Sequence, residues 1–235
     1  MNYGRYALTA IVAVATMGAA THAIAEDQPI SEAEKLLFEN HHMKNVPLPA
    51  TLRYRFVKSG TLEAGYQDDA TLNIELSPSH KGNVIKVGYL TGKNNFKTPD
   101  ITDAKGNPII LSYLEREIAE MKRLTGGSIN YYRKRIRLAL VDDATVKPVT
   151  VMYDGKEVNA SEIRISPYVN DPARPRYEKF AEKYYVFTMS DQVPGGVYQM
   201  KGVLSEKNTG NGQPPGTLLE ETLTFAGLIR QENKQ

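Results

Sequence analysis

Apolar and polar residues alternate along several short segments of the chain. Leu52, Tyr54 and Phe56 are separated by polar residues, and the same period of two returns at 71–76 and at 85–89. Successive side chains of a strand point to opposite faces of its sheet. The pattern therefore predicts three strands of a sheet that has one buried face.

The second half of the chain contains further strand patterns. Asp154-Gly155 is the typical sequence of a tight hairpin turn, and residues 194–196 form a second turn sequence. Residues 208–216 contain too few apolar side chains for anything but a loop. The strands predicted around these turns are 129–141, 149–153, 162–166, 184–189, 197–204 and 218–225.

Residues 108–125 have the period of a helix instead. Asn107 is a good N-cap residue, Pro108 suits the first helical position, and Gly126 ends the run. Apolar residues recur at steps of three and four to form one stripe, which is widened by two more leucines. The stripe consists of Ile110, Leu114, Ile118 and Met121, with Leu111 and Leu124 beside it. We predict one long amphipathic helix that packs on the sheet.

A second, shorter helix is predicted near the N-terminus. Ser31 and Glu34 have the spacing of a capping box, in which each side chain accepts a hydrogen bond from the backbone of the other residue. Pro47 and Pro49 cannot continue a helix, because proline lacks the backbone donor. Residues 26–50 are therefore predicted to form a short helix followed by a proline-rich linker.

Together these elements predict an α+β protein that is mainly antiparallel β. Two arrangements fit: a curved sheet packed on the long helix, or a β-sandwich formed by 128–228 with a boundary near 126–128. We favour one continuous strand-rich domain over 51–228, because the first three strands and the helix would bury little surface alone. Residues 229–235 are predicted to form a frayed tail.

The first 25 residues have the organisation of a secretory signal peptide. Arg5 precedes about a dozen apolar residues, and Ala23 and Ala25 place small side chains before a cleavage site. The apolar run is too short to span a bilayer. We predict cleavage after Ala25 and a soluble mature chain in the periplasm, which meets the membrane only through this leader.

Composition excludes several classes of function. The chain contains no cysteine, which rules out disulfides, thiol catalysis and attachment of c-type haem. Loss of the leader would remove Arg5 and no acidic residue, so the formal net charge would fall from +2 to +1. A charge this balanced does not favour a nucleic-acid partner. No cofactor is predicted.

Tyr131, Arg133, Arg135 and Arg137 are the candidate binding residues. On a strand they would share one face at intervals of about 6.5–7 Å. Three guanidinium groups in a row are suited to an anionic headgroup, a phosphate or an acidic partner surface, because each can donate two parallel hydrogen bonds. The alternative is an ordinary solvated strand face whose charges are neutralised by acidic residues across the sheet.

His41, His42 and Met43 are a candidate copper site, because imidazole and thioether groups bind copper. Adjacent histidines on a helix point about 100° apart, however, and cannot both hold one ion. Histidines in the last turn of a helix commonly donate to its free carbonyl groups instead. We therefore assign no metal site here and expect a helix-capping role.

No catalytic motif is recognised, and no family motif maps onto the chain residue by residue. The order of strands, one amphipathic helix and more strands behind a leader resembles periplasmic carriers of lipids or lipoproteins, in which helices close a curved sheet. We expect a non-catalytic protein that binds an apolar, lipid-like ligand or an envelope protein. The alternatives are a hydrolase or lyase with paired carboxylates on a β-scaffold, and copper handling through His41, His42 and Met43.

Overall fold

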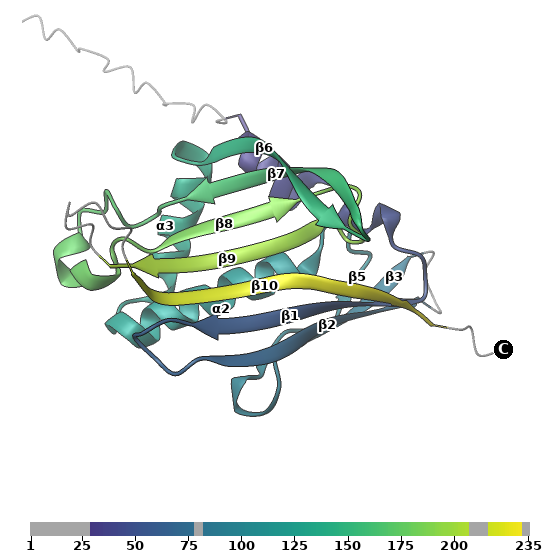
Figure 1. Cartoon of the computed structure of the whole chain (residues 1–235), viewed down its shortest axis with the longest axis horizontal. Coiled ribbons are helices and arrows are strands. Elements are labelled where there is room, and N and C mark those ends of the chain that lie inside the picture. Colours follow the sequence, from purple (N-terminus) through teal and green to yellow (C-terminus); the bar gives the residue numbers. More distant parts are fainter. Residues whose placement is uncertain (1–28, 78–81, 207–215, 232–235) are drawn as a thin grey trace, which may run out of the picture.

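One curved antiparallel sheet organises residues 29–77, 82–206 and 216–231, which are the parts of the chain that the computed structural model describes (Figure 1). The strand order is β4-β3-β2-β1-β10-β9-β8-β7-β6, and β5 pairs with β3. The ten strands are β1 (Ala50–Ser59), β2 (Tyr66–Leu76), β3 (Asn83–Tyr89), β4 (Phe96–Lys97), β5 (Ile101–Thr102), β6 (Thr145–Tyr153), β7 (Lys156–Ile165), β8 (Tyr184–Met189), β9 (Val197–Ser205) and β10 (Thr217–Arg230).

The sheet is a single curved layer rather than a sandwich. β10 pairs with β1 over most of its length, so the strands that follow residue 128 extend the sheet formed by the early strands. Ile229 and Arg230 belong to β10, and their assignment to a frayed tail was wrong. The predicted leader at 1–25, residues 208–215 of the predicted loop and residues 232–235 lie outside the described residues.

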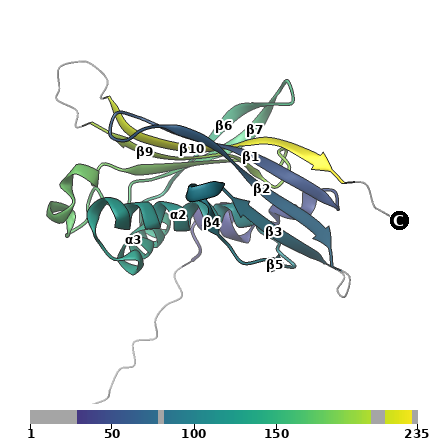
Figure 2. The same ribbon diagram turned by 90° about the horizontal axis from the view of Figure 1, so that it is seen from below.

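Two long helices, α2 (Pro108–Thr125) and α3 (Ile129–Asp142), lie on one face of the sheet, and the β6–β7 hairpin rises from the opposite side (Figure 2). A short N-terminal helical segment precedes β1. It consists of α1 (Glu32–Glu34), a π-helical turn η1 (Lys35–Glu39) and a 3-10 turn η2 (His42–Asn45). Further 3-10 turns are η3 (Gly92–Asn94), η4 (Arg174–Arg176) and η5 (Glu178–Phe180).

The strand predicted over 129–141 is wrong, because this segment forms α3. Its buried residues Tyr132, Ile136, Ala139 and Leu140 recur at steps of four, three and one, which is the spacing of one helix face. The apparent alternation came from the arginines between them. The apolar residues of this segment did not reveal whether the period of a strand or that of a helix applied.

Local capping signals were read correctly. The Asn107 side chain accepts a hydrogen bond from the amide of Ile109, and α2 ends at Gly126, whose φ of 73° is left-handed. The capping box at the N-terminal helix is present, with Ser31 accepting from the Glu34 amide and Glu34 accepting from the Ser31 amide. These signals act within one helical turn, so neighbouring residues suffice to specify them.

The core fills the space between the sheet and the helices. The pairing register aligns Phe56, Leu223, Met200 and Phe187 in one row across β1, β10, β9 and β8, and all four side chains are fully buried. Tyr113 of α2 packs edge-on against Phe187 with ring centroids 6.4 Å apart. The interior is therefore occupied by close-packed aromatic and aliphatic side chains.

One part of the predicted apolar stripe of α2 was wrong. Leu111 is 57% exposed, whereas the charged residues Arg116 and Glu117 are buried. Residues 113, 116 and 117 face the sheet, so the buried side of the helix is rotated away from Leu111. Part of the buried face of α2 therefore consists of charged side chains.

Replacement of Leu114 by alanine tests this orientation. Leu114 is 5% exposed, so we expect Leu114→Ala to lower the free energy of unfolding by about 2–5 kcal/mol through lost burial and the resulting cavity. The matched control Leu111→Ala should change it by less than about 0.5 kcal/mol. Chemical denaturation measures both. Equal losses in the two variants would contradict the observed helix orientation.

Candidate functional site

The helical conformation of α3 separates the predicted arginine row. Arg133 and Arg137 are one turn apart and exposed, whereas Arg135 points in another direction and is half-buried. Arg133 makes a two-pronged ion pair with Glu115 of α2, with Nε 2.8 Å and Nη2 2.7 Å from the carboxylate oxygens. The row therefore does not form one continuous cationic face.

Tyr131 and Arg135 meet at the carboxylate of Asp171. The Tyr131 hydroxyl donates to Oδ1, and the Arg135 Nε lies 3.0 Å from Oδ2 while also donating to the carbonyl of Pro167. Burial opposes ionisation of Asp171, but hydrogen bonds from Tyr131 and Tyr177 outweigh it and lower the pKa of this carboxyl group. These contacts fasten the segment between β7 and β8 to α3. A binding role for this set of residues stays a prediction.

His42 connects the N-terminal segment to the start of α2. Its side chain is buried; Nδ1 accepts a hydrogen bond from the Asn107 amide at 3.1 Å, so Nε2 donates to the Leu36 carbonyl at 2.8 Å. Both ring nitrogens are therefore engaged, and among the described residues no cluster of three or more His, Cys, Asp or Glu could hold a metal ion. Burial is the main cause that lowers the His42 pKa.

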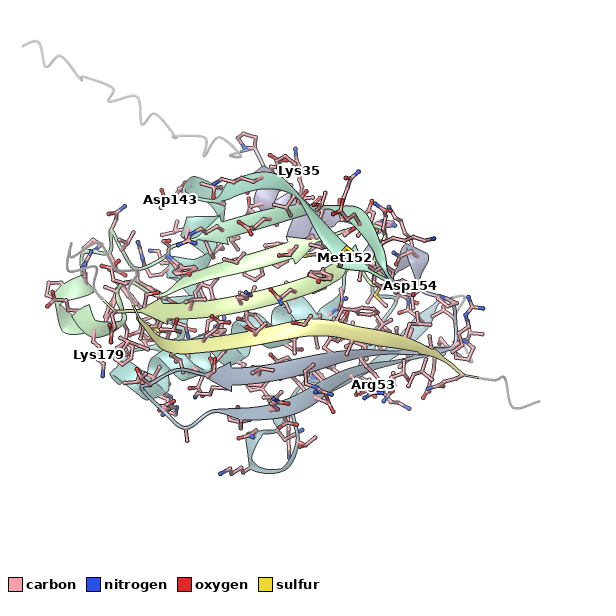
Figure 3. The ribbon with its side chains drawn as sticks, viewed as in Figure 1. Lys35, Arg53, Asp143, Met152, Asp154 and Lys179 are labelled. Atoms are coloured by element: carbon pink, nitrogen blue, oxygen red, sulfur yellow. The ribbon has the colours of Figure 1, made fainter. Side chains whose placement is uncertain are left out.

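The β6–β7 hairpin creates a groove at one end of the sheet. The turn at Asp154-Gly155 has φ angles of 51° and 71°, and the ring of Tyr153 packs 5.9 Å from that of Phe225 in β10. Figure 3 labels Met152 and Asp154 at the hairpin tip. We call the space between this tip and β9–β10 the hairpin groove; its volume is about 650 Å³.

The lining of the hairpin groove combines aromatic and aliphatic side chains with polar groups. Its apolar lining comprises Pro47, Met152, Tyr153, Pro194, Tyr198, Phe225 and Leu228, and its polar lining includes Asn45, Asp154 and Arg230. Such a mixture is typical of small-molecule pockets, in which apolar surface supplies affinity and a few polar groups fix orientation.

One wall of the hairpin groove is held by hydrogen bonds from the side chain of Asn45 to the backbone of residues 191–195. Asn45 donates to the carbonyls of Asp191 and Val193 at 2.8 and 2.9 Å and accepts from the Gly195 amide at 3.0 Å. β10 bulges opposite Arg53, where its pairing with β1 shifts by one residue. The groove is thus preformed, because its floor and one wall are fixed by contacts independent of any ligand.

A cluster of buried charges lies on the other face of the sheet, beneath α2. The pairing register places Lys58, Glu221 and Gly202 side by side on β1, β10 and β9. Glu117 of α2 lies directly above Gly202, where an added Cβ would come within 2.9 Å of Oε2. Only glycine at position 202 leaves room for this carboxyl group. We call Lys58, Arg116, Glu117, Lys183 and Glu221 the buried ionic cluster.

Each acid of the buried ionic cluster has a basic partner. Arg116 donates to Oε1 of Glu221 at 3.0 Å, and Lys58 lies 3.5 Å from the same atom. Lys183 Nζ lies 2.5 Å from Oε2 of Glu117 and 4.0 Å from Oε2 of Glu221. Glu117, Lys183 and Glu221 have no solvent exposure, so their charges are balanced by the groups of the cluster rather than by water.

The two carboxyl groups differ in their affinity for protons. Burial is the main cause that raises the Glu117 pKa to about 8, and the nearby charge of Glu221 adds to it. Burial also opposes ionisation of Glu221, but the charges of Lys183 and Arg116 lower its pKa below the usual value. At neutral pH one proton is therefore held at Glu117 while Glu221 stays ionised.

Paired carboxylates for a hydrolase or lyase would need contact with a substrate. Glu117 and Glu221 face one another, but both are fully buried beneath α2. A glycosidase needs its two carboxyl groups on either side of a bound sugar. This pair is closed to such a ligand, so the geometry does not favour that chemistry.

Sequence reasoning missed the buried ionic cluster. One signal was present: Glu221 stands between Leu219 and Leu223 at a position where strand alternation turns side chains toward the core. A charged residue at such a position predicts a buried partner, although it does not say which one. Lys183 and Glu117 offered no comparable local signal.

Comparisons with known proteins assign no family. No family model matches the chain, and no curated protein matches it either. Among solved structures, the lipoprotein LppX of Mycobacterium tuberculosis aligns at 9% identity with a TM-score of 0.32, covering 79% of this chain and 89% of LppX. A LolA superfamily protein from Nitrosomonas europaea aligns at 10% identity with a TM-score of 0.23, covering 85% and 94%. TM-scores this low carry no weight for function.

None of the helices among the described residues combines the length and the apolar character required to cross a membrane.

Replacement of Gly202 by alanine tests the close contact beneath α2. The new methyl group would lie 2.9 Å from Oε2 of Glu117 and 3.2 Å from the hydroxyl of Tyr113, so one of these buried groups must move. We expect a loss of about 1–3 kcal/mol in unfolding free energy. Gly106→Ala is the control, because its nearest contact would be an ordinary 3.8 Å. A Gly202→Ala variant with the same unfolding free energy as the wild type would refute the contact.

The stability of the protein should fall in mild acid because of His42. Its pKa is below 6.5 in the folded chain, so as pH drops below 6.5 the unfolded chain takes up a proton that the folded chain does not. Denaturation midpoints between pH 7 and pH 5 should therefore fall more steeply in the wild type than in His42→Asn. The exposed neighbour supplies the control: His41→Asn should keep the wild-type slope. Identical slopes in all three proteins would contradict this role.

Proposed function

We propose that this chain is a non-catalytic binding protein of the periplasm that holds an apolar, lipid-like ligand in the hairpin groove. The observation that carries the proposal is the preformed groove of about 650 Å³, which is lined by aromatic and aliphatic side chains together with polar groups such as Asn45 and Arg230. This volume lies within the range of about 300–1,000 Å³ typical of ligand sites.

Exposed apolar surface near the groove supports this assignment. Met152, which lines the groove at the hairpin tip, is 56% exposed. Methionine is flexible and polarisable, so it adapts to ligands of irregular shape. A bound hydrocarbon chain would remove this surface from water.

One end of the groove is suited to an anionic headgroup. Arg230 lines the groove close to the C-terminal end of β10. A guanidinium group can donate two parallel hydrogen bonds to a carboxylate or phosphate. The proposed ligand is therefore amphipathic, with its chain against Tyr198 and Phe225 and its anionic group at Arg230.

The interior beneath α2 is a less suitable site for an apolar ligand. Close-packed core side chains and the buried ionic cluster occupy it, and a hydrocarbon chain placed there would separate charges that have no access to water. The hairpin groove can be filled without such a cost. This contrast favours the outer site over the inner one.

Two further parts of the proposal come from the sequence. The signal-peptide pattern at 1–25 supports export, and hence a periplasmic site of action. Arg137 supplies exposed positive charge on α3 that would suit an anionic membrane surface or an acidic envelope partner during loading, and Arg133 would join it on release from Glu115. Tyr131 and Arg135 would position α3 through Asp171.

Binding of a fluorescent C16 fatty acid to the purified mature chain tests the proposal. We expect about one probe per chain and at least a tenfold loss of affinity in Met152→Asp, because a carboxylate would face the hydrocarbon. Leu111→Asp is the matched control, since Leu111 is equally exposed but lies on α2, and it should bind as the wild type does. Arg230→Ala should weaken binding of the fatty acid but not of its methyl ester.

Two results would contradict this function. The first is equal affinity of the Met152 and Leu111 variants for the probe, which would show that the ligand does not bind in the groove. The second is no probe binding together with no lipid extracted from chain purified after export. That outcome would refute the ligand half of the proposal in favour of docking to an envelope protein.

A further inference from the structure

Lys183 and Glu117 approach each other more closely than an ordinary ion pair needs. Nζ lies 2.5 Å from Oε2, and both side chains are completely shielded from solvent. Nevertheless, neither Nζ nor either oxygen of Glu117 has a hydrogen-bond partner of acceptable geometry. The Lys183 amine therefore lies beside the Glu117 carboxyl group without the alignment of an ordinary hydrogen bond.

A second acid stands beside this pair. Oε2 of Glu221 lies 4.0 Å from Nζ of Lys183 and also lacks a hydrogen-bond partner, while its Oε1 accepts from Arg116 at 3.0 Å. Each of the carboxyl groups of Glu117 and Glu221 affects the pKa of the other, so the two are close neighbours. The three groups have the arrangement of a nucleophile, an electrophile and a proton carrier.

We propose that Lys183 and Glu117 condense to an intramolecular amide bond, with Glu221 as the catalytic proton carrier. This cross-link would join α2 to the residues immediately before β8. The inference is independent of ligand binding in the hairpin groove, because the two sites lie on opposite faces of the sheet.

The reaction needs no further reagent. Glu117 holds a proton at neutral pH and enters as a neutral carboxylic acid, and the ionised Glu221 takes one proton from the Lys183 ammonium group to leave a neutral amine. The lone pair of Nζ then forms a bond to Cδ of Glu117, and Glu221 gives its proton to the departing hydroxyl group, which leaves as water. The nitrogen passes its surplus proton back to Glu221, so one amide and one water form and Glu221 ends protonated.

The surroundings favour this reaction. The Lys183 Nζ lies 5.5 Å from the ring centroid of Tyr185, and Tyr113 is also fully buried beside the pair. Removal of water favours a neutral Glu117 and protects the amide from hydrolysis. Burial also opposes the charge of Lys183, but the charges of Glu117 and Glu221 outweigh it and raise the Lys183 pKa, so a carboxylate of the cluster has to take up the proton of the amine. Arg116 and Lys58 on the far side keep Glu221 ionised and able to accept a proton.

Another buried lysine of the cluster provides the contrast. Lys58 donates a hydrogen bond to Oε2 of Glu63 at 2.6 Å, and the Glu63 side chain is 27% exposed. This pair has hydrogen-bond geometry and access to water, which are the features of an ordinary ion pair. Condensation is therefore expected at Lys183 and not at Lys58.

Intact mass spectrometry of the exported, purified chain tests the proposal. Once its N-terminal residue is known, the mass should be lower than the sequence mass by one water, about 18 Da. Trypsin does not cleave after an acylated lysine, so digestion should yield peptide 117–122 joined to peptide 180–201. A wild-type protein with the full sequence mass and separate peptides would overturn the proposal.

Variants distinguish the reacting groups. Glu221→Gln cannot carry the proton and should show the full sequence mass, whereas Lys58→Met should keep the loss of one water. Lys183→Arg should abolish the joined peptide. The mass of the wild-type protein alone shows whether the amide bond forms, so the test does not depend on whether a variant folds. A loss of one water that persists in Lys183→Arg would also refute this bond.

Discussion

The burial of charge between α2 and the sheet constrains the rest of this structure. Glu117, Lys183 and Glu221 are withdrawn completely from water, and removal of ions from water is tolerated only when opposite charges lie close enough to compensate. That requirement fixes the rotation of α2, so that Leu111 faces solvent while Glu117 faces β9. It also requires glycine at position 202, since a larger residue would displace the carboxyl group from its partners.

The same constraint separates the two faces of the sheet into different roles. The face covered by α2 and α3 is close-packed and closed (Figure 2). The ion pairs couple α2 to β10 and to Lys183, which precedes β8, and they couple β1 to β10. On the opposite side, the β6–β7 hairpin stands clear of the core and borders a preformed hollow. Proteins commonly carry their binding residues on connecting segments that a rigid scaffold holds in place.

Local sequence signals predicted the elements whose determinants lie within a few residues. The caps of α2 at Asn107 and Gly126, and the hairpin turn at Asp154, were predicted correctly because each depends on its immediate neighbours. The prediction failed at α3, where Arg133, Arg135 and Arg137 imitated a strand face. Pattern alone could not weigh those arginines against the helical spacing of Tyr132 and Ile136, since burial against α2 and β7 decided it.

The sequence by itself determined the class of fold, the strand-rich core, the long helix and the absence of cysteine chemistry, because these follow from composition and periodicity. Only the tertiary structure decided which side chains meet. Glu221 on β10, Glu117 on α2 and Lys183 before β8 become neighbours through strand register and helix packing, which act between distant segments. The hairpin groove has the same origin: Met152 and Phe225 lie 73 positions apart in the sequence, and the pairing of strands brings them to one hollow.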